Sequence, residues 1–131
     1  MQELDWLLTN MAQTVDGVQS AVILSPDGLA LGRTPGLEAA DAEQLAALAA
    51  GAASLAHGTG MKFGCGDVQQ TIFEMESLLM FITPAGRGTS VALLADTAAD
   101  PGQVAYELSV LVKRVGEHMV ANPRFPVPDA V

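Results

Sequence analysis

The sequence predicts one α/β domain of the α+β type, in the order helix, two strands, helix, three strands, helix. Two observations predict this class. Apolar residues recur at helical spacing in three segments, and short apolar runs bounded by turn residues mark five strands. Several of these runs are apolar at every position, as in strands that are covered on both faces. A sheet with helices on both sides would supply that cover.

The first helix is predicted over Leu4–Val15, and Gly17 follows it as a left-handed cap. A hairpin comes next, with strands at Val18–Leu24 and Leu29–Leu31. They are joined by a Ser-Pro-Asp-Gly turn, in which the proline fixes φ and Gly28 accepts a positive φ.

The second helix is predicted over Asp41–His57, with a capping-box-like pair formed by Asp41 and Gln44. We expect one stripe of this helix to face the core: Leu45, Leu48, Ala52, Leu55 and Ala56. The remaining faces are small and almost uncharged, whereas a solvated helix face normally carries charge. The alternatives are a contact surface and a simple preference for alanine as a strong helix former.

A glycine-rich connector is predicted over residues 58–67, followed by strands at Val68–Met75, Leu78–Thr83 and Ser90–Ala95. The first of these strands is the most polar, which is typical of a sheet edge. The last helix begins with an Asp-Pro pair, Asp100 as N-cap and the proline in the first helical position. The domain is expected over residues 1–122, with a flexible proline-rich tail at 123–131.

Composition limits the partners. The net charge is −9, from 15 acidic and 6 basic residues, so a nucleic-acid backbone would be repelled. No apolar run reaches the roughly 18 residues of a membrane helix, and no signal peptide is recognisable, so no membrane insertion is expected. The single cysteine cannot form an intrachain disulfide, which fits a cytoplasmic protein.

Catalytic and cofactor motifs are lacking. The segment Gly58–Gly64 holds glycines and a lysine but no Gly-Lys-Ser/Thr, and it leads out of a helix rather than into one. Cys65 and His57 have no recognisable third partner, and the two histidines and one cysteine have no metal-site spacing. We therefore expect no catalytic residue, no metal and no cofactor. An enzyme that uses Cys65 as its nucleophile is kept as an alternative hypothesis.

Three segments carry a resemblance to a known family: Leu4–Leu8, Val15–Val18 and Ala21–Leu29. Together with the element order and the alanine-rich second helix, they make the chain resemble the roadblock/LC7 family, and its stand-alone bacterial members in particular, over about residues 2–122. The resemblance implies a profilin-like fold with a five-stranded antiparallel sheet between helices and no active site. It also implies dimers that join edge strands and pack second helices together.

The function that the resemblance implies is that of a regulatory or adaptor homodimer. Such a dimer binds a small Ras-like GTPase and modulates its nucleotide cycle, with activation of the GTPase in a bacterial signalling operon as one form of this role. The alternative is a sensory module of profilin-like architecture that binds a small molecule in a pocket between sheet and helix.

The candidate site residues follow from these expectations. One flank of the second helix and the edge strand are predicted to form the dimer interface: Ala47, Gly51, Ser54, Gly58, Gln70, Ile72 and Glu74. The other flank of the helix is predicted to bind the GTPase: Ala46, Ala50, Ala53 and His57.

Overall fold

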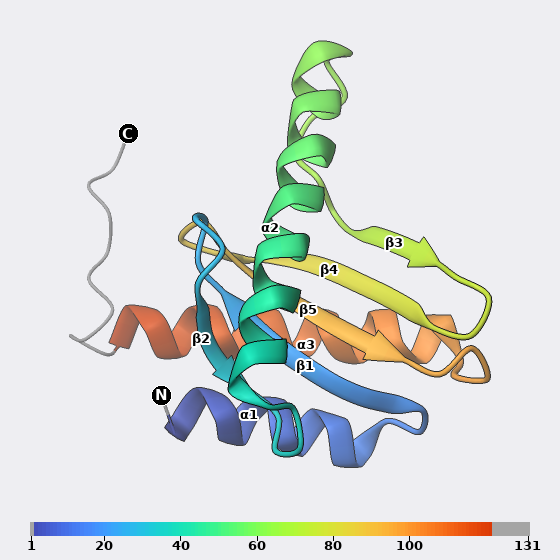
Figure 1. The fold of residues 1–131 in the computed structure, drawn as a ribbon. Helices are drawn as coiled ribbons and strands as arrows, with labels where there is room; N and C mark the ends of the chain where they lie inside the picture. The colour runs from blue at the N-terminus through green and yellow to red at the C-terminus, as the bar shows by residue number, and fades with distance from the viewer. Residues whose placement is uncertain (1, 122–131) are drawn as a thin grey trace.

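The computed structural model describes residues 2–121, and it describes side chains from residue 4 to residue 118. The three helices and five strands occur in the predicted order (Figure 1). Their bounds are α1 Gln2–Thr14, β1 Val18–Leu24, β2 Ala30–Arg33, α2 Ala39–Lys62, β3 Thr71–Glu74, β4 Leu79–Gly86, β5 Thr89–Ala95 and α3 Pro101–Ala121. The predicted tail at 123–131 lies outside the described residues.

The strands form one sheet in the order β2-β1-β5-β4-β3, and every neighbouring pair is antiparallel. Helices α1 and α3 cover one face of the sheet and α2 crosses the other (Figure 1). The five-stranded antiparallel sheet between helices is thus confirmed. Strand β3 lies at one edge, as its polar sequence predicted.

The face covered by α1 and α3 holds the larger core. It is filled by long side chains from both helices and the central strands, including the fully buried Leu4, Leu8, Phe81, Leu93 and Leu108. Two helices side by side leave little of this face open to solvent. This layer therefore holds most of the large buried side chains of the domain.

The face covered by α2 is packed differently. The helix contacts the sheet mainly through small residues, and its buried positions are Ala42, Leu45, Ala46, Ala49 and Ala52. The prediction that Leu48 and Leu55 face the core was wrong, because these side chains are 68% and 76% exposed. A methyl side chain lets a helix backbone lie close to a sheet, whereas a leucine in the same place would hold it away.

The ends of α2 also differ from the prediction. The helix starts after Glu38, whose side chain makes no capping hydrogen bond, and Asp41 already lies in the first turn, so the predicted capping box was wrong. At the other end the helix continues through Gly58 to Lys62. A Cβ atom on Gly60 would lie 2.7 Å from the carbonyl oxygen of Gly66, so the returning chain packs closely against this last turn.

The strands after α2 differ in length from those predicted. Strand β3 is shorter than expected, and β4 extends to Gly86 because a two-residue turn, Arg87 and Gly88, joins it to β5. Both turn residues have positive φ, 58° and 77°. The predicted long loop is therefore a tight hairpin that lies beside the β1–β2 turn: a Cβ atom on Gly88 would lie 2.7 Å from Cγ of Pro26.

The predictions for the β1–β2 turn and for the N-cap of α3 were confirmed. In the β1–β2 turn Gly28 has a φ of 84° and its N–H donates to the carbonyl of Ser25 over 3.0 Å. The Asp100 carboxylate accepts a hydrogen bond of 3.0 Å from the N–H of Gly102, which makes it the N-cap of α3.

Candidate functional site

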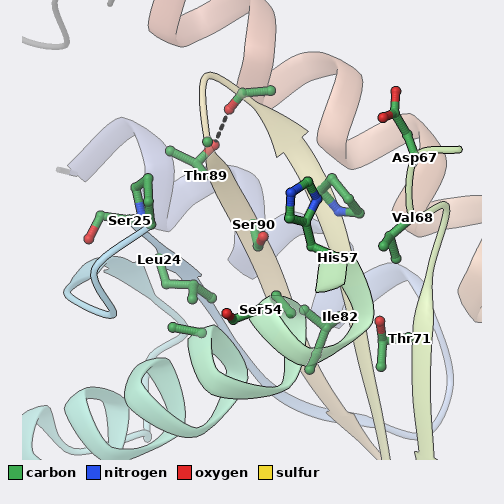
Figure 2. Close-up of a pocket in the computed structure, with 16 residues that line it drawn as sticks. Leu24, Ser25, Ser54, His57, Asp67, Val68, Thr71, Ile82, Thr89 and Ser90 are labelled. Carbon is green, nitrogen blue, oxygen red and sulfur yellow. Dashed lines mark hydrogen bonds between the residues drawn. The ribbon is translucent and has the colours of Figure 1, made fainter. Parts of the chain in front are cut away.

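A cavity of about 560 Å³ lies beside the second half of α2 (Figure 2). Four segments enclose it: α2, the β1–β2 turn, the β4–β5 hairpin and the chain that enters β3. Its lining residues are Leu24, Ser25, Pro26, Ala50, Ala53, Ser54, His57, Asp67, Val68, Thr71, Ile82, Pro84, Gly86, Gly88, Thr89 and Ser90.

Apolar side chains from three elements line the inner wall of the cavity. Leu24 of β1 and Ile82 of β4 are almost fully buried, and the half-buried Ala50 and Ala53 of α2 lie above the sheet. The β1–β2 turn approaches α2 closely, since a Cβ atom on Gly28 would lie 3.4 Å from the Ala50 Cβ. The cavity therefore has walls set by regular structure and tight turns.

The polar groups of the cavity fall into two sets. The hydroxyl groups of Ser25 and Thr89 are engaged within the protein. Ser25 donates to Asp27 over 2.7 Å. Thr89 donates to the carbonyl of Gly86 over 2.6 Å, the bond that is dashed in Figure 2. The second set makes no side-chain hydrogen bond or ion pair with any residue that the structure describes: Ser54, His57, Asp67, Thr71 and Ser90.

The hydrogen bond within the β1–β2 turn affects the charge of the turn. Donation from Ser25 and from the backbone of Asp27 itself lowers the pKa of the Asp27 carboxyl below its usual value of 3.8. Asp27 is fully exposed and does not line the cavity. Its carboxylate therefore stabilises the turn beside the cavity without adding charge to the cavity wall.

The structure brings three of the four predicted GTPase-binding residues together. Ala50, Ala53 and His57 all line the cavity, and Ser54, which we predicted at the dimer interface, joins them. Ala46 does not, because its side chain is fully buried against the sheet. The placement of Ala46 on a partner surface was wrong for the same reason as the inward placement of Leu48: the helix is rotated from the expected orientation.

The outer side of α2 carries the rest of the predicted helix flank. Ala47, Gly51 and Gly58 are exposed, and a Cβ atom on either glycine would meet no atom within 4 Å. The exposed Leu48 and Leu55 lie on the same helix. Sequence reasoning missed these two as surface residues, because their spacing of seven places them on one face of the helix without saying whether that face is buried.

Strand β3 presents the predicted edge. Ile72 and Glu74 lie in the strand and Gln70 just before it, and all three lie at the edge of the sheet. Phe73 pairs with Met80, whose side chain faces α2, so the 41% exposed Phe73 lies on the same side of the sheet as α2. With the 44% exposed Met75, it extends the apolar surface of α2 onto the sheet edge.

Of the two residues considered for a catalytic pair, His57 lines the cavity and Cys65 does not. Cys65 is exposed in the loop after α2, its thiol lies 3.5 Å from the carbonyl oxygen of Phe63, and it does not line the cavity as His57 does. Among the residues described, no group of three or more His, Cys, Asp or Glu side chains could hold a metal ion. Within residues 2–121, no helix has the length and apolar character needed to cross a membrane.

Comparison with known proteins identifies the family. The model of the Roadblock/LC7 domain matches residues 4–95. A crystal structure of a Roadblock/LC7 domain from Streptomyces avermitilis is 42% identical, with a TM-score of 0.86, over 89% of this chain and 98% of that chain.

Two more distant structures share the fold. Myxococcus xanthus MglB has a TM-score of 0.84 at 12% identity, over 93% of this chain and 98% of that one. Acanthamoeba castellanii profilin IB has a TM-score of 0.61 at 17% identity, over 84% and 93%, which confirms the profilin-like architecture. The family model and the Streptomyces structure together show that this chain belongs to the Roadblock/LC7 family.

Proposed function

We propose that this protein is a non-catalytic regulatory homodimer that binds a small Ras-like GTPase and modulates its nucleotide cycle. One observation carries the proposal: the outer surface of α2 is apolar and exposed beside an open sheet edge. Leu48, Leu55, Met61 and Phe63 are each at least 68% exposed on α2 and the residue that follows it. Leu48 and Leu55 are seven residues apart and therefore share one flank of the helix, and exposed apolar surface of this kind is typical of protein interfaces.

The dimer would form around the overhang of α2. The C-terminal part of this helix extends past β3, beyond the sheet of its own protomer (Figure 1). If β3 pairs with β3 of a second copy about a two-fold axis, the sheet continues beneath the overhang. The pairing would also satisfy the unpaired backbone groups of the edge. Leu55 and Phe73 then become buried between the two protomers.

The GTPase would dock on the flank of α2 that borders the cavity. Ala50 and Ala53 present small side chains there beside the imidazole of His57, and none of the three is a lysine or arginine. Small residues lose little conformational entropy on burial, so a modest apolar contact can be favourable. We choose a Ras-like GTPase as the partner because the chain belongs to the Roadblock/LC7 family, and the resemblance to that family implies this role.

The dimer is tested with Leu55→Asp and a matched control, Leu29→Asp, which changes another exposed leucine in the β1–β2 turn. We expect light scattering at micromolar concentration to report dimers for the wild type and the control. The Leu55→Asp variant should be a monomer, because a carboxylate would be buried without a partner. A monomeric wild type, or a dimeric Leu55→Asp variant, contradicts this half of the proposal.

The GTPase contact is tested with Ala50→Arg against Ala40→Arg, which places the same charge in the exposed first turn of α2. Calorimetry would use a Ras-like GTPase from the same genome, loaded with a non-hydrolysable GTP analogue. We expect Ala50→Arg to abolish binding while the dimer persists, and Ala40→Arg to bind normally. Wild-type affinity in Ala50→Arg places the contact elsewhere, and single-turnover GTP hydrolysis then measures any effect on the nucleotide cycle.

A further inference from the structure

We infer that the cavity beside α2 is a binding site for a small organic molecule with an apolar ring and a hydrogen-bonding group, neutral or cationic but not anionic. Its volume of about 560 Å³ lies inside the range of roughly 300–1,000 Å³ that is common for small-molecule sites. The inference does not depend on the proposed GTPase, because it concerns direct binding to this chain alone.

The first argument is the combination of an apolar wall with several converging polar groups. Leu24, Ile82 and Ala53 provide a surface on which a ring can be buried. Ser54 and His57 come from α2, Thr71 from β3 and Ser90 from β5, so the polar groups reach the cavity from three elements (Figure 2). Such an arrangement of few polar groups around an apolar pocket fixes the orientation of a ligand.

The second argument is that these polar groups have bonding capacity to spare. Ser54, His57, Thr71 and Ser90 make no side-chain hydrogen bond to another residue in the described part of the chain, whereas Ser25 and Thr89 in the same wall do. Each hydroxyl can donate one hydrogen bond and accept others, and a neutral imidazole can do both. A ligand amine, amide or hydroxyl would therefore find partners on more than one side.

Charge selects the ligand class. Among the residues that the structure describes, the lining contains one carboxylate, Asp67, and no lysine or arginine, and the whole chain carries a net charge of −9. An anionic ligand would meet a repulsive field, with His57 as the one side chain that could carry a positive charge among the lining residues. A cationic amine would instead be attracted to Asp67, which lies at the right-hand rim in Figure 2.

The cavity would stay accessible in the proposed dimer. Ala50 follows Leu48 by two residues, which is about 200° around a helix of 3.6 residues per turn. The flank of α2 with Leu48 and Leu55 would contact the second copy, whereas Ala50 and His57 face the other way. Dimer formation and occupation of the cavity are therefore compatible.

The experiment compares three indoles that differ in charge: tryptamine, tryptophol and indole-3-acetate. Titration of the ¹⁵N-labelled protein by NMR follows the amides of Ser54, His57 and Ser90. We expect saturable shifts with tryptamine and tryptophol at millimolar concentration and much weaker binding of indole-3-acetate. Asp67→Asn should weaken tryptamine about two- to fivefold, the size of an exposed ion pair, and leave tryptophol unchanged.

Two cavity-filling variants and a control locate the site. Ala53→Trp should abolish binding of both ligands, and Ser54→Phe, at an exposed position, provides a second test if Ala53→Trp fails to fold. Ala40→Trp, on the same helix but outside the cavity lining, should bind normally. The inference is overturned if neither tryptamine nor tryptophol shifts these amides, if indole-3-acetate binds as well, or if a folded filling variant retains binding.

Discussion

The two faces of the sheet are packed by different rules. On one face, α1 and α3 bury large side chains such as Leu8, Phe81 and Leu108 and cover the strands between them. On the other face a single helix rests on alanines, and two of its leucines point to solvent. The helices of the first face therefore bury their large apolar residues, whereas α2 buries mainly alanines and leaves Leu48 and Leu55 exposed.

The difference separates stability from binding within one small domain. Burial of a large apolar side chain contributes about 1.5–3 kcal/mol, so the α1/α3 face holds the larger share of such contributions. The α2 face gives up part of that stabilisation, because alanines bury little area. This face has instead an exposed apolar helix flank, an open strand edge and a cavity in which Ser54, His57 and Ser90 make no side-chain hydrogen bond to another described residue.

The largest effect is expected from the closed face. Phe81→Ala should lower the free energy of unfolding by about 3–5 kcal/mol, because it leaves a cavity under both helices. Urea unfolding at a fixed protein concentration measures this change. Leu29→Ala, at a 55% exposed leucine, is the control and should cost little. If Phe81→Ala lowers the free energy of unfolding no more than Leu29→Ala does, the claim that the α1/α3 face holds the larger share of the stabilisation is contradicted.

A smaller effect is expected where α2 rests on the sheet. Ala46→Leu should cost about 1–3 kcal/mol through overpacking, since Ala46 is fully buried between the helix and the strands. Ala40→Leu, in the exposed first turn of the same helix, should change stability far less. Thermal unfolding of the two variants measures the difference in stability. Equal melting temperatures would mean that α2 can move away from the sheet without a loss of stability.

Two glycines offer the same substitution on the two faces. Gly51→Ala should raise stability by about 0.5–1 kcal/mol, because helix propensity improves and the new methyl group meets no atom within 4 Å. Gly116→Ala in α3 should gain less, since its Cβ would lie 3.2 Å from the carbonyl oxygen of Ala85. Chemical denaturation of both variants gives the difference, and a larger gain at Gly116 would contradict the closed packing of that face.

The smallest effect concerns the β1–β2 turn beside the cavity. The lowered pKa of Asp27 means that its carboxylate stabilises the fold above the usual pKa of 3.8, and that this contribution is lost as the pH falls through the lower folded value. Asp27→Asn should therefore be less stable than the wild type at neutral pH, with a gap that narrows in acid. A gap that widens below pH 3.8 would show that Asp27 contributes in the opposite sense.

Features that depend on neighbouring residues could be predicted from the sequence. The Ser-Pro-Asp-Gly turn, the Asp100 cap of α3 and the order of all eight elements follow from local conformational preferences and hydrogen bonds. The polar character of β3 placed it at the sheet edge, because an edge strand tolerates residues that a central strand cannot bury. The family resemblance supplied the five-stranded antiparallel sheet and its place between helices, whereas the strand order came from the structure.

Tertiary structure decided the orientation of α2 and the existence of the cavity. Leucines outrank alanines in hydrophobicity, so the sequence favoured Leu48 and Leu55 for the core. The helix instead faces the sheet with four alanines and Leu45, and Leu48 and Leu55 are exposed. The cavity depends on where the β1–β2 turn, the β4–β5 hairpin and the chain before β3 meet α2. Local preference determines what an element is, but the space between packed elements determines which side chains it buries.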